Sequence, residues 1–162
     1  MNLAITHALH CIESRHLRPA VLLVADLRRP PTSNRLTALD LRGPHPRVIL
    51  RATVAEGAGG IGDKLGSRAS APGLYAVGLP YRGEHGETWR LDGLSRSDWR
   101  AASRAIVLHS AAYVTTGWAG RSWGCPAVSA ATLAEMRPWL PPKGKAALWI
   151  DAPGATCGAG PR

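Results

Sequence analysis

Short apolar runs, separated by turn residues, repeat along most of the chain. The run Val21-Leu22-Leu23-Val24-Ala25 is continuous and is followed by charged residues, which is typical of a buried strand. Similar runs, some continuous and some alternating, predict about seven strands. They lie at residues 20–27, 35–41, 48–54, 74–79, 89–91, 105–108 and 146–150.

Helical spacing appears in few places. Apolar residues at this spacing predict a short helix over residues 3–15 that ends before Pro19. Ser129 is a natural N-cap for a second helix over residues 130–136, and one or two helical turns are expected within residues 97–104. Because turns rather than helices join most strands, we predict a mainly β fold, an antiparallel sheet or sandwich with two or three short helices.

Composition agrees with this picture. A chain of 162 residues suits one domain with one core, and its hydrophobic share of 45% argues against disorder. The 18 Gly and 13 Pro residues suit short strands and turns better than a helical bundle. Residues 56–73 are rich in glycine and predict a long loop of a kind that is often functional. They contain no GxxxxGK[ST] nucleotide-binding pattern.

Neither a membrane span nor an export signal is visible in the sequence. No apolar run approaches the ~20 residues that a membrane-spanning helix needs. The first ten residues, MNLAITHALH, lack a basic start and a long apolar stretch, so we identify no signal peptide.

The chain is strongly basic. Its formal net charge of +9, from 20 basic and 11 acidic residues, attracts polyanions such as nucleic acid, anionic lipid or an anionic cell-wall polymer. The basic residues are scattered, however, and no alternating aromatic and basic platform of the kind that single-strand binders use is present. We therefore predict no nucleic-acid site and interpret the Arg-rich surface as one that favours solubility.

The three cysteines are Cys11, Cys125 and Cys157, and their spacing matches no zinc site, so we expect no metal. Cys11 and Cys157 lie near opposite termini, and both a disulfide and two free thiols remain open. Cys125 stands apart, because it lies between a glycine and a proline in the stretch GRSWGCPAV, residues 120–128.

A reactive thiol needs a base, an open approach and positive surroundings. His109 follows the predicted strand 105–108 and is the candidate base. Gly124 leaves room for an approaching carbonyl, and the backbone N–H groups of residues 123–125 are candidates to hold an oxyanion. A lone cysteine is usually a small buried hydrophobe, and a lone histidine at a strand end is usually a polar cap. The residues alone therefore leave packing and reactivity equally open.

At these residues the chain resembles a known family. Residues 105–110 (Ala-Ile-Val-Leu-His-Ser), Tyr113 and GRSWGCPAV are similar to the catalytic segment of L,D-transpeptidase catalytic domains. The similarity is greatest to the murein L,D-transpeptidase branch, whose signature contains a Trp-Gly-Cys-Pro-Ala run. The hairpin at 21–40, Gly-Glu-His-Gly at 83–86 and Leu-Asp-Gly-Leu at 91–94 resemble the same branch more weakly. The resemblance covers residues 18–151.

The resemblance implies an L,D-transpeptidase-like β-sandwich and an enzyme of peptidoglycan stem peptides that needs no metal or organic cofactor. It implies that Cys125 attacks the carbonyl between a diamino acid and the terminal D-alanine, releasing D-alanine and forming a thioester. An amine of a second stem then takes the acyl group, which gives a cross-link. The resemblance further implies that His109 acts as general base and is oriented by the backbone carbonyl of Ser110. It also implies that Ser122 and Gly124 shape the oxyanion loop.

Further roles near the thiol are our own inference. Tyr113 and Trp123 are expected to line the pocket, and Arg121 to meet a stem-peptide carboxylate. Trp123 stands where the wider family often has His before the Gly-Cys pair, a change that the branch shares. We interpret Glu56 as a solvated loop carboxylate and His85 as a turn histidine, for which only the nearby motif leaves a pocket role open.

The predicted organisation is an N-terminal helical lead (1–17), a catalytic domain (18–152) and a flexible tail (153–162). The resemblance implies a periplasmic or cell-envelope location and covalent inhibition by carbapenem β-lactams. Three alternatives remain open. The chain is an L,D-carboxypeptidase if water is the acceptor, or it is another thiol peptidase that uses the same Cys and His. The third alternative is a non-catalytic basic module that binds peptidoglycan.

Overall fold

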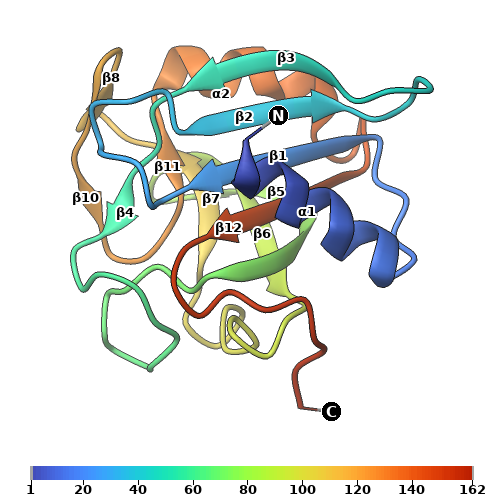
Figure 1. Cartoon of the computed structure of the whole chain (residues 1–162). Coiled ribbons are helices and arrows are strands. Elements are labelled where there is room, and N and C mark those ends of the chain that lie inside the picture. Colours follow the sequence, from blue (N-terminus) through green and yellow to red (C-terminus); the bar gives the residue numbers. More distant parts are fainter. Residues whose placement is uncertain (1, 162) are drawn as a thin grey trace.

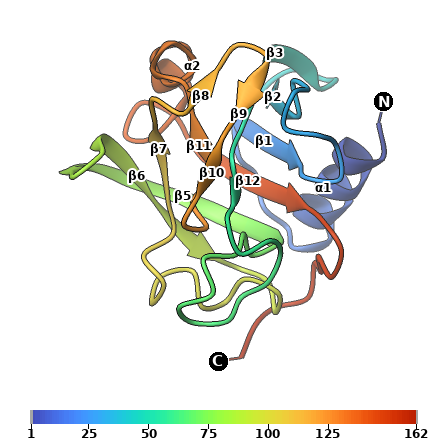
Figure 2. The same cartoon turned by 90° about the vertical axis from the view of Figure 1, so that its left-hand side faces the viewer.

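The computed structural model of the chain describes residues 2–161. Its largest feature is a curved eight-stranded sheet, accompanied by two two-stranded ladders (Figure 1, Figure 2). The helical segments are α1 (Leu3–Ser14), α2 (Ala130–Met136) and the 3-10 helix η1 (Arg137–Trp139). The strands are β1 (Val21–Asp26), β2 (Leu36–Asp40), β3 (Arg47–Ala52), β4 (Glu56–Gly57), β5 (Gly73–Gly83), β6 (Gly86–Gly93), β7 (Val107–Ser110), β8 (Val114–Thr115), β9 (Trp118–Ala119), β10 (Arg121–Ser122), β11 (Ala127–Val128) and β12 (Ala146–Asp151).

The main sheet has the strand order β11-β7-β6-β5-β12-β1-β2-β3. The strands β1, β2 and β3 form one antiparallel meander, and β5, β6 and β7 form another. Between them lies β12, which pairs antiparallel with β5 and parallel with β1. Because β11 also pairs parallel with β7, the sheet is mixed and not wholly antiparallel as the turn signals predict. Turn signals report pairing between neighbouring strands only, and these two parallel pairs do not form across a tight turn.

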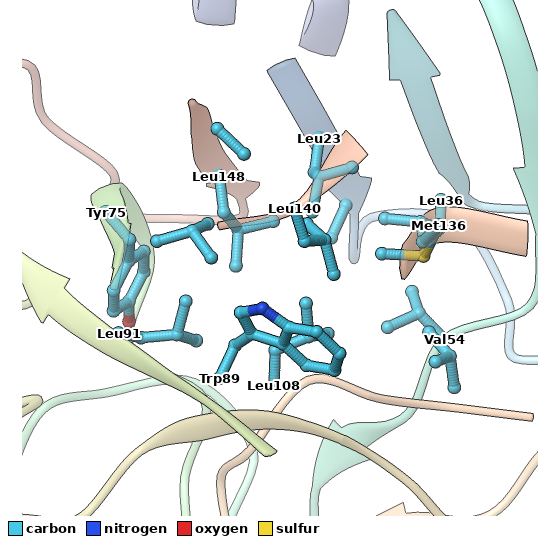
Figure 3. Close-up of a cluster of buried hydrophobic side chains, with 14 of the residues drawn as sticks. Leu23, Leu36, Val54, Tyr75, Trp89, Leu91, Leu108, Met136, Leu140 and Leu148 are labelled. Carbon is cyan, nitrogen blue, oxygen red and sulfur yellow. The ribbon is translucent and has the colours of Figure 1, made fainter. Parts of the chain in front are cut away.

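Both faces of the central strands are buried. On one side lies the larger core, which includes Leu23, Tyr75, Trp89, Leu108 and Met136 (Figure 3). On the other side α1 packs against a second core formed by alternate residues of the same strands. It includes Leu22, Val24, Leu39, Leu74, Ala147 and Trp149. A strand covered on two faces needs apolar residues throughout, which explains the continuous run at Val21–Ala25.

The fold prediction is confirmed: the chain is mainly β, with the helices at both expected places. Asn2 caps α1 and Ser129 caps α2, each through its side-chain oxygen. Residues 97–104 form successive turns rather than a regular helix. None of the helices within residues 2–161 has the length and apolar character that crossing a membrane requires.

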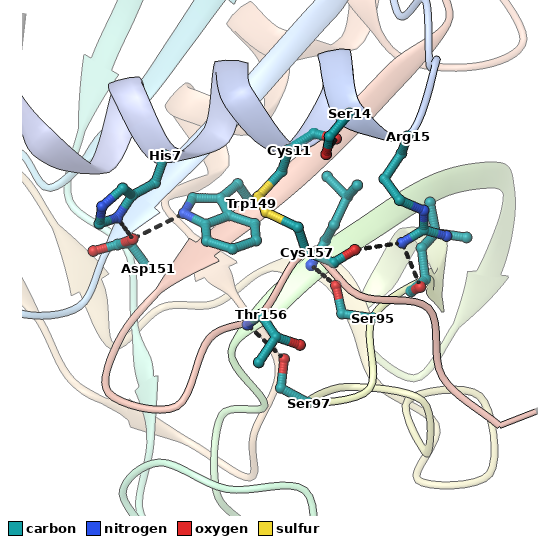
Figure 4. Close-up of a disulfide and its surroundings, with 12 residues drawn as sticks. His7, Cys11, Ser14, Arg15, Ser95, Ser97, Trp149, Asp151, Thr156 and Cys157 are labelled. Atoms are coloured by element: carbon teal, nitrogen blue, oxygen red, sulfur yellow. Dashed lines mark hydrogen bonds and ion pairs between the residues drawn. A yellow bond between two sulfur atoms is a disulfide. The ribbon is translucent and has the colours of Figure 1, made fainter.

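A disulfide joins Cys11 of α1 to Cys157 in the C-terminal segment, across 146 residues of sequence (Figure 4). Arg15 donates to the carbonyl of Cys157 at 2.8 Å, and the N–H of Thr156 donates to Ser97 Oγ at 3.2 Å. These contacts hold residues that the sequence predicts as part of a flexible tail. The division into lead, catalytic domain and tail stays a prediction, but the first and last of these segments are bonded to each other.

Removing the disulfide is expected to destabilise the fold without affecting the remaining thiol. The double variant Cys11→Ala/Cys157→Ala should lose about 2–5 kcal/mol of unfolding free energy, since closing a long loop restricts the unfolded chain. Urea denaturation measures this loss. Dithiothreitol should lower the stability of the parent and leave that of the double variant unchanged, and an equal effect on both would contradict the assignment.

One carboxyl group is buried without a full set of partners. Asp98 is fully buried, and its Oδ1 accepts a hydrogen bond from the N–H of Ser95 at 2.8 Å. Within the described residues its Oδ2 has no hydrogen-bond partner. Burial raises the pKa of Asp98 to about 8. The group is therefore held in its neutral, protonated form at neutral pH.

This carboxyl should make stability depend on pH. Its folded-state pKa lies above the ordinary carboxyl value near 4, so the stability it contributes is present at low pH and is lost as the pH rises from about 4 through about 8. Asp98→Asn stays neutral and should be more stable than the parent at pH 9 by at least about 1.4 kcal/mol, the equivalent of one pKa unit. Thermal unfolding at pH 5 and pH 9 tests this. A parent and variant with the same pH dependence would contradict it.

Candidate active site

The loop that carries Cys125 is fixed from several sides. Strand β10 leads into it and pairs parallel with β4, with Ser122 opposite Gly57. The hydroxyl of Ser122 donates to the carbonyl of Cys125 at 2.7 Å and accepts from the N–H of Gly124 at 3.1 Å. These bonds fold the loop back on itself. They also occupy the N–H of Gly124, which leaves the amides of Trp123 and Cys125 as candidates for an oxyanion site.

Gly124 is required by its surroundings. Its φ is +113°, and a Cβ there would lie 2.6 Å from the carbonyl oxygen of Ala69 and 3.0 Å from Ile106 Cδ1. The glycine-rich segment 56–73 supplies the Ala69 side of this wall. Its Ser70 hydroxyl accepts from the N–H of Gly57 at 2.8 Å and donates to the carbonyl of Gly124 at 3.5 Å. The long loop predicted at residues 56–73 therefore contacts and supports the loop that carries Cys125.

His109 lies on β7, opposite Ala127 of β11, and is 2% exposed. Its Nδ1 lies 2.8 Å from the carbonyl oxygen of Ser110. A carbonyl oxygen only accepts hydrogen bonds, so Nδ1 carries the proton and Nε2 of the neutral ring has a free lone pair. Burial, followed by the neighbouring His85, lowers the pKa of His109. A neutral ring with a free Nε2 is the form that can accept a proton.

Cys125 is partly buried, and its Sγ lies 3.9 Å from the carbonyl oxygen of Ala105. Burial raises the pKa of the thiol, although the hydrogen bond to Val107 and the charge of Arg104 oppose this. The charge of Arg104 is balanced by that of Asp63, whose Oδ1 lies 3.2 Å from Arg104 Nη1. At neutral pH the site therefore holds a thiol and a neutral imidazole rather than an ion pair.

Cys125 lines two cavities. One, of about 450 Å³, is also lined by Glu84, His85, His109, Tyr113, Arg121, Ser122 and Trp123. The other, of about 600 Å³, extends over Arg68, Tyr81 and Arg104. Between them Trp123 is 71% exposed, and the guanidinium of Arg68 lies 4.2 Å from the centre of its ring. Within residues 2–161 no group of three or more His, Cys, Asp or Glu side chains is arranged to hold a metal ion.

The structure brings the side chains predicted from the sequence into one place. Cys125, His109, Tyr113, Arg121, Ser122 and Trp123 line the smaller cavity, Ser110 contributes its carbonyl and Gly124 lies within the loop. Glu56, interpreted as a solvated carboxylate, is partly buried instead, with its Oε2 3.9 Å from Arg35 Nη1. Arg35 is buried and unavailable to solvent.

Two residues lie closer to the site than the sequence indicates. His85 lies in the turn, as expected, and its ring also stacks on that of His109, with the centroids 4.0 Å apart and the planes at 14°. The Gly-Glu-His-Gly stretch at 83–86, which resembles the murein branch, was the available signal. Arg104 lines the larger cavity beside the thiol, and nothing in the sequence around it distinguishes it from the other arginines.

A family model described as the L,D-transpeptidase catalytic domain matches residues 2–145. The chain belongs to this family. No curated protein matches the sequence.

These structures share the fold at low sequence identity. The helical cell shape determining protein Pgp2 of Campylobacter jejuni matches with a TM-score of 0.60 and 13% identity, covering 82% of this chain and 47% of that one. An L,D-transpeptidase from Mycobacterium smegmatis matches with a TM-score of 0.54 and 14% identity, covering 84% and 60%. The L,D-transpeptidase LdtMt1 in complex with imipenem matches with a TM-score of 0.53 and 15% identity, covering 83% and 60%. The chain thus spans about half to three fifths of the length of these relatives.

The protonation state of the site predicts how Cys125 reacts with a simple alkylating agent. Because burial raises the pKa of the thiol, iodoacetamide labelling should keep accelerating as the pH rises, and be at least ~10-fold faster at pH 9.5 than at pH 7. Mass spectrometry should find one label on the parent and none on Cys125→Ala, since the other two cysteines form the disulfide. A rate that levels off near pH 7 would indicate a preformed thiolate and contradict this assignment.

Proposed function

We propose that this chain is a cysteine-dependent L,D-transpeptidase that acts on peptidoglycan stem peptides through a thioester on Cys125. Membership of the L,D-transpeptidase family supports this. The observation that carries the proposal is the geometry of His109. Its Nδ1 is held by the Ser110 carbonyl at 2.8 Å, and its ring lines the same cavity as Cys125.

The first half-reaction forms the acyl-enzyme. His109 Nε2 takes the proton of the Cys125 thiol as Sγ attacks the carbonyl that precedes the terminal D-alanine. The resulting oxyanion is held by backbone N–H groups of the loop, those of Trp123 and Cys125. The tetrahedral intermediate collapses, the C–N bond breaks, and the imidazolium gives its proton to the departing amine. D-Alanine leaves and a thioester remains.

The second half-reaction transfers the acyl group. The side-chain amine of a second stem attacks the thioester carbonyl, and His109 removes the proton that the amine loses. The C–S bond breaks, and the imidazolium returns its proton to the Cys125 thiolate, which restores the resting pair. Water in place of the amine follows the same steps and gives L,D-carboxypeptidase action.

The cavity around the thiol supplies the groups that bind a stem peptide. Arg121 is exposed at this cavity and binds a stem-peptide carboxylate through charged hydrogen bonds. Tyr113 and Trp123, both exposed, provide the walls against which the stem packs. Charge complementarity with an anionic wall polymer also suits the formal net charge of +9.

The location we propose is the cell envelope, where peptidoglycan lies. The disulfide between Cys11 and Cys157 supports an oxidising compartment such as the periplasm. Carbapenems are proposed as covalent inhibitors, and the similar fold of a transpeptidase bound to imipenem supports the choice of that drug as a probe.

Exposure to imipenem should add one drug mass to the parent and none to Cys125→Ala. His109→Gln should slow this acylation by about 10²-fold or more, because the general base is lost. Intact-protein mass spectrometry measures both effects. A stem tetrapeptide ending in D-alanine should give the matching thioester and free D-alanine, and an added amine acceptor should give the cross-linked product.

Two controls make this test decisive. Circular dichroism should show that Cys125→Ala and His109→Gln are folded, and a tetrapeptide ending in L-alanine should give no thioester. Release of D-alanine without any cross-link in the presence of the acceptor would assign the carboxypeptidase. Absence of both adduct and thioester on folded parent would refute the proposed function.

A further inference from the structure

The turn between β5 and β6 places a second histidine, His85, against the candidate general base His109. Gly83 pairs with Gly86, so Glu84 and His85 form the tip of this hairpin. The ring of His85 lies flat on that of His109, with the centroids 4.0 Å apart and the planes at 14°. His85 also lines both cavities that meet at Cys125. The side chain therefore touches the candidate base without being part of the cysteine loop.

The stacking restricts the orientation of His109. The Ser110 carbonyl holds one edge of the imidazole at Nδ1, and His85 covers one of its faces. A ring held by one edge could still rotate about its side-chain bonds, whereas a stacked partner disfavours tilting. Together the two contacts fix the direction of Nε2, and such fixed geometry is what proton transfer to and from a thiol requires.

The stacking also places an ionisable group directly beside the base. Charge at His85 opposes the formation of a cation at His109, and it adds to the effect of burial in lowering the pKa of His109. The other ionisable groups that line the smaller cavity with His85 and His109 are Glu84, Tyr113, Arg121 and Cys125. Of these, Glu84 acts in the opposite sense, since its carboxylate favours a charged His109, and it lies 3.4 Å from His85 Nε2.

We propose that His85 is a positioning residue that keeps His109 oriented and unprotonated, so that the base stays available to Cys125 in mildly acidic solution. The inference rests on the proposed function of His109 as the base. It adds to that function a residue from another element of the fold, whose role is exerted through His109 rather than on the substrate.

Two substitutions separate the steric and electrostatic parts. His85→Phe keeps a stacked ring and removes the charge, so the rate of imipenem acylation at pH 8 should stay close to that of the parent. The acid limb of the pH–rate profile of this variant should move to higher pH by several tenths of a pH unit, because His109 is then protonated more readily. His85→Ala also removes the ring, and should slow acylation at pH 8 by roughly tenfold, well short of the loss expected when the base itself is removed.

An NMR titration of His109 in the full chain gives a readout that is independent of activity. His85→Phe and His85→Ala should both raise the pKa of His109, whereas Glu84→Gln should lower it or leave it unchanged. His45→Phe, which changes an exposed histidine in a turn outside both cavities, should alter neither the titration nor the acylation profile.

The outcomes distinguish the two proposals. If the parent is acylated on Cys125 but the His85 variants match it in both pH profile and titration, the role of His85 is refuted while the proposed function stands. If the folded parent forms neither the imipenem adduct nor the stem-peptide thioester, the proposed function fails. The titration alone then decides whether His85 controls the protonation of His109.

Discussion

The parallel pairing of β7 with β11 is the constraint on which the candidate site depends. It sets Ala127 opposite His109 and Val128 opposite Ser110. Cys125 precedes this pair by two residues, so the backbone hydrogen bonds of the sheet determine how near the thiol can come to the imidazole. The pairing of β10 with β4 fixes the other end of the loop. The loop that carries the thiol is thus held between the edge of the large sheet, at β11, and the two-stranded ladder of β10 and β4.

Such backbone positioning allows the reacting groups to remain uncharged at rest. Burial raises the pKa of Cys125 and lowers that of His109, and both shifts favour the neutral forms. An ion pair is therefore not needed to hold the two side chains in place. Arg104 is 3% exposed and is balanced by Asp63, so it adds little net charge beside the thiol. A resting thiol is a weak nucleophile, so in the proposed reaction proton transfer to His109 accompanies the attack.

Much of this arrangement could be predicted because its signals are local. Continuous apolar runs mark strands buried on both faces, and Ser129 marks the start of α2. Cys125 and His109 stand out through their immediate neighbours. The parallel pairs of β1 with β12 and β7 with β11 could not be predicted, since no turn joins these strands. The stacking of His85 on His109 depends in the same way on tertiary structure, because it requires the register of one hairpin and its packing against another strand.

The β5–β6 hairpin explains why a histidine at a turn can be held accurately. Its strands form an extended antiparallel ladder, and Trp89 within it is buried and donates to the Pro141 carbonyl at 2.7 Å. Nearer the tip, Glu87 accepts a hydrogen bond from Arg137 of η1 at 2.6 Å. Turn residues usually move more than the elements they connect, but here β6 is bonded to the Pro141 carbonyl and to η1, and β5 pairs with β6 up to the turn. The contact of His85 with His109 therefore depends on the pairing and packing of this hairpin.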